Sequence, residues 1–141
     1  MSDEAAFRRL FVSSLRPHCL CEYMSSMNKV GVPDIHIVHR GRAVWPELKF
    51  VTSWPKSREA NVLHHRFSGP QLTFLKRVDA QGGLGLGVVG FRDGKKWKCV
   101  ALRQWNIRHD GTVTKSEIER HRVMSFDNGF ALTFLTILER A

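Results

Sequence analysis

A short turn between two strand-like segments is the feature that most constrains what this chain can fold into. Residues 34–39 alternate apolar and polar side chains, and residues 43–51 have the pattern of a second strand. Arg40-Gly41-Arg42 separates the two segments, with the length and composition of a hairpin turn. The sequence therefore predicts two adjacent antiparallel strands as part of a β-sheet.

Helices are predicted on both sides of this hairpin. Ser2 is suited to cap a first helix, which carries apolar residues at helical spacing between 7 and 15 and ends at Arg16-Pro17. A second helix is expected to begin at Ser68-Gly69-Pro70 and to end at Gly82-Gly83. Residues 18–31 predict a loop or a short strand, and the polar, basic residues 52–66 predict a mobile loop.

The C-terminal half continues with strands and then helices. Residues 86–91 predict a buried strand, which a turn at Asp93-Gly94 connects to a partner strand at 97–102. The capping-box pattern from Thr114 to Glu117 predicts a short helix, and Asp127 is expected to cap a final apolar helix.

These elements predict an α/β fold in which helices sandwich a mixed β-sheet. The chain has 141 residues, a length that suits one domain built on one core. We expect residues 1–141 to form a single domain. Its core would span about 4–102, and a C-terminal helical extension would span about 114–140.

The charge of the chain indicates a polyanionic partner. Lys and Arg number 22 against 13 Asp and Glu, which gives a formal net charge of +9. Because the basic residues are spread along the chain and form no amphipathic basic helix, nucleic acid is favoured over a membrane surface. There is no bilayer-length apolar run and no secretory pattern at the N-terminus. We expect a cytoplasmic protein, and the three cysteines are expected to be idle thiols.

Asp34, Glu47 and Lys49 form the candidate site. The predicted hairpin brings Asp34 near Glu47, and two close carboxylates repel each other unless a cation lies between them. Mg²⁺ prefers such oxygen ligands, and the carbonyl of Leu48 could add another. Lys49 shares a strand face with Glu47 and could orient an attacking water or stabilise phosphorane charge. The alternatives are a turn aspartate at 34 and an ordinary exposed strand face at 47–49.

Glu4 is a further candidate metal ligand. It falls within the arc of the inward apolar stripe of the first helix, where a charged residue needs a partner. The alternative is a first-turn glutamate that the helix dipole favours, and the sequence leaves both possibilities open.

The motifs together resemble the PD-(D/E)xK nucleases. Gly31-Val-Pro-Asp34 followed by Trp45-Pro-Glu-Leu-Lys49, with a downstream helix that begins at Pro70-Gln71 and ends in Gly82-Gly83, is similar to the VRR-NUC and Holliday-junction-resolvase-like branch, which includes small phage endonucleases. The resemblance covers residues 4 to about 91. Pro46 departs from a regular strand, because proline donates no ladder hydrogen bond, and it predicts an edge or bulge there.

The resemblance implies a restriction-endonuclease-like core of αβββαβ order and a structure-specific DNA endonuclease. Phosphodiester hydrolysis by a metal-activated water would use Mg²⁺, or Mn²⁺, held by Asp34 and Glu47 with help from Glu4. Gln71 would support the site, and Glu22 is the nearest match to a further family carboxylate. The resemblance also implies branched DNA as substrate, a homodimer, and the host cytoplasm as location if the chain is phage-encoded.

A basic cluster between the second strand and the second helix is the candidate DNA contact. A solvated loop is the alternative interpretation of this cluster. Its members are Lys56, Arg58, His64, His65 and Arg66.

Two other functions compete with the nuclease. One is a DNA-binding or assembly protein with the same fold that does not cleave. The other is an RNA-binding protein in which Trp54, Trp97 and Trp105 stack bases, although tryptophans more often belong to the core.

Overall fold

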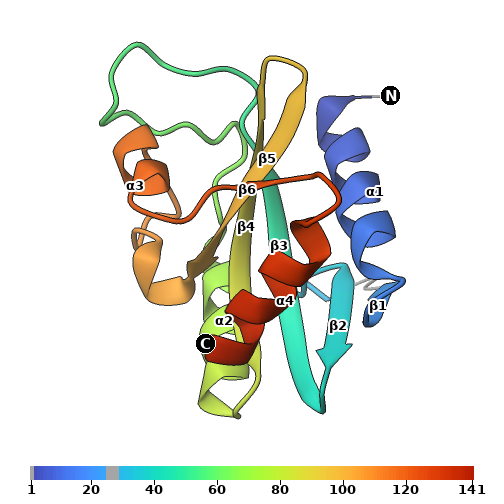
Figure 1. Ribbon diagram of the computed structural model, residues 1–141. Coiled ribbons are helices and arrows are strands. Elements are labelled where there is room, and N and C mark those ends of the chain that lie inside the picture. Colours follow the sequence, from blue (N-terminus) through green and yellow to red (C-terminus); the bar gives the residue numbers. More distant parts are fainter. Residues whose placement is uncertain (1, 25–28) are drawn as a thin grey trace.

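A six-stranded mixed sheet forms the centre of the protein (Figure 1). The computed structural model describes residues 2–24 and 29–141, and the strands follow one another across the sheet in chain order, from β1 to β6. The helices are α1 (Asp3–Leu15), α2 (Gly69–Ala80), α3 (Lys115–Glu119) and α4 (Phe130–Arg140), with a 3₁₀ turn at Gln104–Asn106. The strands are β1 (Leu20–Tyr23), β2 (Ile35–His39), β3 (Arg42–Phe50), β4 (Leu84–Asp93), β5 (Lys96–Arg103) and β6 (Met124–Ser125).

The predicted hairpin is confirmed and lies inside the sheet. β2 and β3 are antiparallel, with Ile37 opposite Val44. Arg40 and Gly41, between them, both have positive φ angles, 51° and 78°, as a tight hairpin turn of the primed type requires. β3 then pairs in parallel with β4. The order from α1 to β4 is αβββαβ, so the expected fold class is confirmed.

Pro46 is accommodated without a bulge. It pairs in register with Leu86 of β4, whereas the pairing of β3 with β2 ends at Val44. From Trp45 onwards, β3 therefore has a ladder partner on its β4 side alone, and a residue without an N–H fits there. The expected edge is thus a local one, within a strand that is otherwise central.

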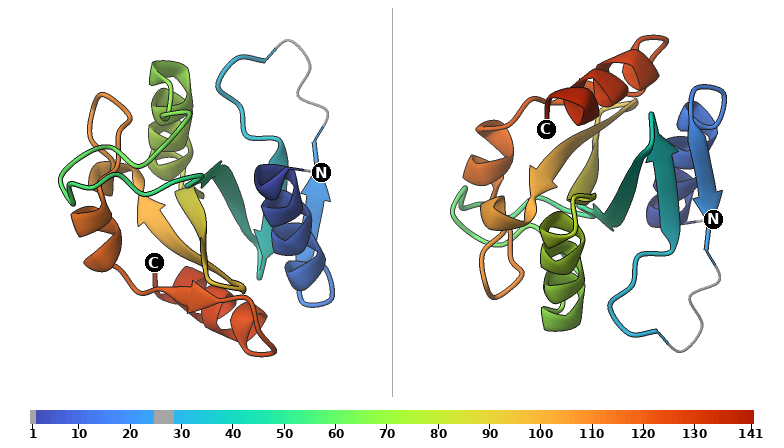
Figure 2. Two further views of the ribbon diagram at one scale, coloured as in Figure 1. Left: turned by 90° about the horizontal axis from the view of Figure 1, so that it is seen from above. Right: turned by 90° about the horizontal axis from the view of Figure 1, so that it is seen from below.

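The two faces of the sheet carry separate hydrophobic clusters. Residues of α1 and α4 cover one face, where Phe11 contacts Phe134 edge to face at 5.4 Å between ring centroids. Residues of α2, α3 and the segment 51–67 cover the other face. Figure 2 shows α2 and α4 on opposite sides of the sheet.

The C-terminal part differs from the sequence prediction in two places. β6 has no counterpart in that prediction; it is two residues long and pairs antiparallel with β5. Asp127 is not the N-cap of α4, because Gly129 holds that position with no side-chain cap; the Asp127 carboxylate instead accepts the Gly129 N–H at 2.9 Å. The capping box of α3 is present as expected, and α2, whose start at Ser68-Gly69-Pro70 is confirmed, also begins with a capping box, which was not predicted.

Two segments of loop-like composition are more ordered than that composition indicates. The 18–31 segment, expected to be a loop or a short strand, contains the short strand β1, and its residues 25–28 lie outside the described residues. In the 52–66 segment, the expectation of a mobile loop does not hold for the second half. Val62 N–H bonds to Val113 O at 2.8 Å and Phe67 N–H bonds to Gly111 O at 3.0 Å, so residues 111–113 anchor it.

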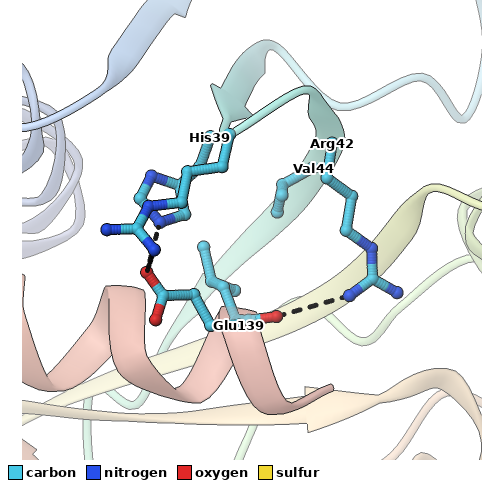
Figure 3. A pocket seen from close by; sticks show the side chains of 6 residues that line it. His39, Arg42, Val44 and Glu139 are labelled. Atoms are coloured by element: carbon cyan, nitrogen blue, oxygen red, sulfur yellow. Dashed lines mark hydrogen bonds and ion pairs between the residues drawn. The ribbon is translucent and has the colours of Figure 1, made fainter.

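The end of α4 is attached to the β2–β3 turn (Figure 3). The Arg42 guanidinium donates to Leu138 O and to Ala141 O at 3.3 and 2.7 Å, which places a cation at the negative end of the helix. Glu139 accepts from His39 at 3.0 Å and lies 3.3 Å from Arg40. A cavity of about 330 Å³ opens at this contact, and the charged side chains that line it already pair with one another.

Among the described residues, no helix is long and apolar enough to cross a membrane.

Packing at Gly90 gives a prediction about stability. A Cβ at Gly90 would lie 2.5 Å from the ring of the fully buried Phe7. We expect Gly90→Ala to lower the free energy of unfolding by about 1–3 kcal/mol through overpacking. Urea denaturation of the wild type and the variant measures this difference in the free energy of unfolding. Gly69→Ala is the matched control, because a methyl group added at Gly69 would have no neighbouring atom within 4 Å, and it should have little effect. Equal stability of the two variants would contradict this account of the α1–β4 contact.

Candidate active site

A polar cavity of about 350 Å³ lies where α1, β3 and the start of α2 approach one another. It brings together most of the candidate residues from the sequence, and it adds two that were not predicted, Arg8 and Val32. Its lining consists of Glu4, Arg8, Val32, Asp34, Glu47, Leu48, Lys49, His65 and Gln71.

Strand β3 supplies a carboxylate and an ammonium group to this cavity from one face. Val44 and Phe50, on the opposite face, are buried in the cluster beneath α1 and α4. Lys49 is only 8% exposed, and its ammonium nitrogen lies 5.4 Å from the centroid of the Phe67 ring. Burying a lysine to this extent is costly, so β3 does not present an ordinary solvated face at this position.

Burial raises the pKa of Glu47 to about 7. Desolvation is the largest cause, because it disfavours the charged carboxylate. The nearby Lys49 lowers the pKa, Asp34 raises it and Arg8 lowers it. The effect of Asp34 means that the two carboxylates are close enough to repel each other, which is the arrangement that a cation would relieve.

Asp34 reaches the site from the residue just before β2. The β2–β3 pairing ends at Ile37–Val44; Asp34 lies three residues before Ile37 and Glu47 three residues after Val44, and both line the cavity. The carbonyl of Asp34 accepts the Met24 N–H at 2.7 Å, so an extension of the β1–β2 ladder fixes its backbone. Its carboxylate forms an ion pair with Arg8.

Arg8 is the main residue that the sequence reasoning missed. It lies one helical turn beyond Glu4 on α1, and residues four apart share a helix face. The i, i+4 spacing from a candidate ligand was therefore the available signal. In the structure its guanidinium acts as a counter-ion to Asp34, so the site already attracts positive charge.

Gln71 and Leu48, both predicted at the site, also line the cavity. Gln71 completes the capping box of α2: its side-chain oxygen accepts the Ser68 N–H at 2.9 Å, which leaves the amide NH₂ for other contacts. The side chain of Leu48 packs against the hydrophobic cluster beneath α1, so the backbone is the polar group that Leu48 offers to the cavity.

Glu22 lies elsewhere. It is exposed on β1 and forms an ion pair with Arg16 at 3.3 Å. Within residues 2–24 and 29–141, no three His, Cys, Asp or Glu side chains are placed together as a metal-ligand set. The oxygen donors that fit a cation here are accordingly two carboxylates, Asp34 and Glu47, with the Leu48 carbonyl, and the exposed Glu4 lines the same cavity.

The basic candidate residues divide between the cavity and the surface. His65 lines the cavity and contacts the ring of His64. Lys56, Arg58 and Arg66 are exposed. Arg58 forms an ion pair with Glu119 of α3 at 2.6 Å, so its charge is partly compensated within the protein.

Comparison with known proteins identifies the fold and no family. The structure of Archaeoglobus fulgidus Hjc, a Holliday junction resolvase from an archaeal hyperthermophile, is similar with a TM-score of 0.58 at 13% sequence identity, over 83% of this chain and 90% of that one. This coverage is longer than the residues 4–91 that carry the sequence resemblance. No protein-family model and no curated protein matches the chain.

The raised pKa of Glu47 predicts how stability depends on pH without added metal. The folded protein retains the Glu47 proton between the ordinary pKa of 4.5 and about 7. The unfolded chain releases it in that window, so the free energy of unfolding should fall as pH rises through it. Denaturation in a chelator measures the decline. Glu47→Gln should remove roughly 1–3 kcal/mol of it.

An exposed carboxylate provides the control for this measurement. Glu22→Gln should keep the decline, because Glu22 lies outside the cavity. An unchanged pH dependence in Glu47→Gln would show that Glu47 is not held in a desolvated position.

Proposed function

We propose that this protein is a metal-dependent endonuclease that hydrolyses DNA phosphodiester bonds, with Asp34, Glu47 and Lys49 at its centre. The observation that carries the proposal is the burial of Lys49 and the partly buried, desolvated carboxylate of Glu47 on one face of β3, where they face a polar cavity beside Asp34. The likeness in fold to a Holliday junction resolvase supports it. In this proposal the chain is one nuclease domain of the PD-(D/E)xK superfamily, of the VRR-NUC or resolvase-like branch.

The residues at the site fit a hard divalent cation, Mg²⁺ or Mn²⁺. Asp34, Glu47 and the Leu48 carbonyl would hold it, with Glu4 acting through water. The fit rests on the repulsion between two carboxylates, one of them desolvated, which a cation removes. When bound, the ion supplies Lewis-acid charge to a phosphoryl oxygen and makes a nearby water more acidic.

Lys49 acts as a fixed donor in the proposed reaction. Its ammonium has lost most of its solvent and lies over the Phe67 ring, so its orientation is set before the substrate binds. From there it donates to the attacking water or to the phosphoryl oxygen on which charge develops. A buried donor of this kind needs little reorganisation during the reaction.

Arg8 and Gln71 assist from the two helices that flank the cavity. Arg8 neutralises the charge of Asp34 before the cation binds. Once the cation has replaced Arg8 as the partner of Asp34, the guanidinium is free to bind a non-bridging phosphate oxygen. Gln71 contributes its remaining amide NH₂ as a neutral donor to the same cavity.

DNA architecture is the proposed basis of substrate choice. A net charge of +9 favours backbone contacts, and the branched substrate named for the neighbouring structure indicates a junction, fork or flap. Cutting two strands of a branch takes two sites, so we propose that the protein acts as a homodimer.

A DNA-binding protein that does not cleave is the second candidate. The observation that favours it is the ion pair of Arg8 with Asp34, which occupies one of the two carboxylates. A cleavage assay separates the two candidates directly.

Removal of either carboxylate should abolish cleavage and spare binding. We expect Asp34→Asn and Glu47→Gln to slow cleavage of junction, flap and linear DNA by about 100-fold or more, because the cation loses a ligand. Affinity for DNA rests on Lys and Arg and should persist. Cleavage is measured with Mg²⁺ and with chelator. Glu139→Gln, at the other end of β2–β3, is the control and should cut at the wild-type rate.

Cleavage at the wild-type rate by either site variant would refute the assignment of the site. Absence of cleavage by the wild-type protein on all three substrates, with DNA binding intact, would select the non-cleaving candidate.

Binding should weaken steeply with salt and follow DNA shape. Lys56→Gln combined with Arg66→Gln should reduce the slope of log affinity against log salt by up to about two. The charge-matched control Arg40→Gln with Arg140→Gln lies away from the proposed DNA path and should leave the slope unchanged. A junction should outcompete a linear duplex of the same sequence in an anisotropy assay. Equal affinity for the two would contradict selection by structure.

A further inference from the structure

A second cavity lies on the face of the sheet that carries Lys49. It has a volume of about 350 Å³ and opens between the β4–β5 hairpin, α3 and the segment that follows β3. Phe91 lies in its wall, two residues along β4 from Val89, the register partner of Lys49, which is a rise of about 7 Å. The lining consists of Trp54, Phe91, Arg92, Asp93, Lys98, Lys115, Ile118, Glu119 and Val123.

Trp54 gives this cavity an accessible aromatic surface held in place. The indole contacts the Phe91 ring edge to face at 5.4 Å, and the Lys115 ammonium lies 5.2 Å from its centroid. The side chain nevertheless stays 38% exposed. Val123, on the same wall, is also exposed, whereas Phe91 and Ile118 are buried beneath. Trp54 therefore has aromatic surface that is accessible to a ligand in addition to the surface that packs against Phe91.

The charges in the cavity favour an anion. Both acidic residues of the lining already have partners: Asp93 accepts a hydrogen bond from Lys98 at 2.8 Å, and Glu119 forms an ion pair with Arg58 at 2.6 Å. Lys115 forms no ion pair within the described part of the chain. Arg92, at the rim, is paired with Asp3 at 3.7 Å and lies over the Trp97 ring at 4.9 Å, so Lys115 is the cation that remains for an anion.

We propose that this cavity binds an unpaired nucleotide of single-stranded DNA. The base stacks on Trp54, and the adjoining phosphate pairs with Lys115. Rigid aromatic surfaces beside cationic side chains are the combination by which proteins bind single strands without reading sequence. A paired base keeps both faces in the duplex stack, so an unpaired one is required. The inference rests on the proposed function only in taking DNA as the partner.

Binding of a labelled oligothymidylate of about ten nucleotides tests the proposal by fluorescence anisotropy, with chelator present. Trp54→Ala should weaken binding about 5- to 100-fold, the loss expected for one stacked base. Trp54→Phe should recover most of it. An abasic oligonucleotide of the same length and charge should bind the wild type and Trp54→Ala equally. Trp105→Ala is the matched control, because Trp105 is 61% exposed and lies outside the cavity.

Lys115→Gln should weaken binding of both oligonucleotides and reduce the salt slope by about one. An equal loss in Trp54→Ala and Trp105→Ala, or an equal loss for the abasic strand, would overturn stacking at this cavity. Tighter binding of oligouridylate than of oligothymidylate would overturn the assignment to DNA. If the wild-type protein cleaves no DNA but still binds oligothymidylate through Trp54, the proposed endonuclease fails and this site stands.

Discussion

The position of β3 inside the sheet, with a hydrophobic cluster on each face, is the constraint on which the rest of the structure depends. The strand pairs with β4 along most of its length and with β2 at its start, while helices cover the sheet on either side. Any polar side chain on its second half must therefore lose solvent. Glu47 and Lys49 are the polar residues at that position, and the burial of Lys49 and the raised pKa of Glu47 follow from where the strand lies in the sheet.

Local signals account for most of the fold that could be predicted from the sequence. The hairpin at Arg40-Gly41, the start of α2 at Ser68-Gly69-Pro70 and the capping box of α3 depend on neighbours a few residues apart, and all three are present. The parts of the fold that the sequence did not predict depend on contacts between residues far apart in the chain. β6 is too short to show a periodic pattern and exists because β5 offers it an edge. The segment 61–67 has a loop composition but is held by residues 111–113, a pairing that no local pattern indicates.

The residues of the candidate site also fall into those that local patterns predict and those that depend on tertiary packing. Asp34, Glu47 and Lys49 could be found together because a hairpin register relates them, and the structure brings them to one cavity. Their catalytic roles remain a proposal. Arg8 could not be found by that route, because its approach to Asp34 depends on how α1 lies across the sheet. The burial of Lys49 likewise depends on Phe67, which reaches it from a distant segment.

The anchoring of the segment that contains Phe67 has a consequence for how the site is assembled during synthesis. Phe67 lies under the Lys49 ammonium, and its backbone is held by Gly111, in the last third of the chain. The donor that faces the cavity thus gains its aromatic support only after those late residues have left the ribosome. Contacts between segments so far apart in sequence form slowly. A nascent chain that already contains Asp34, Glu47 and Lys49 therefore lacks the complete candidate site, whose assembly waits for residues 111–113.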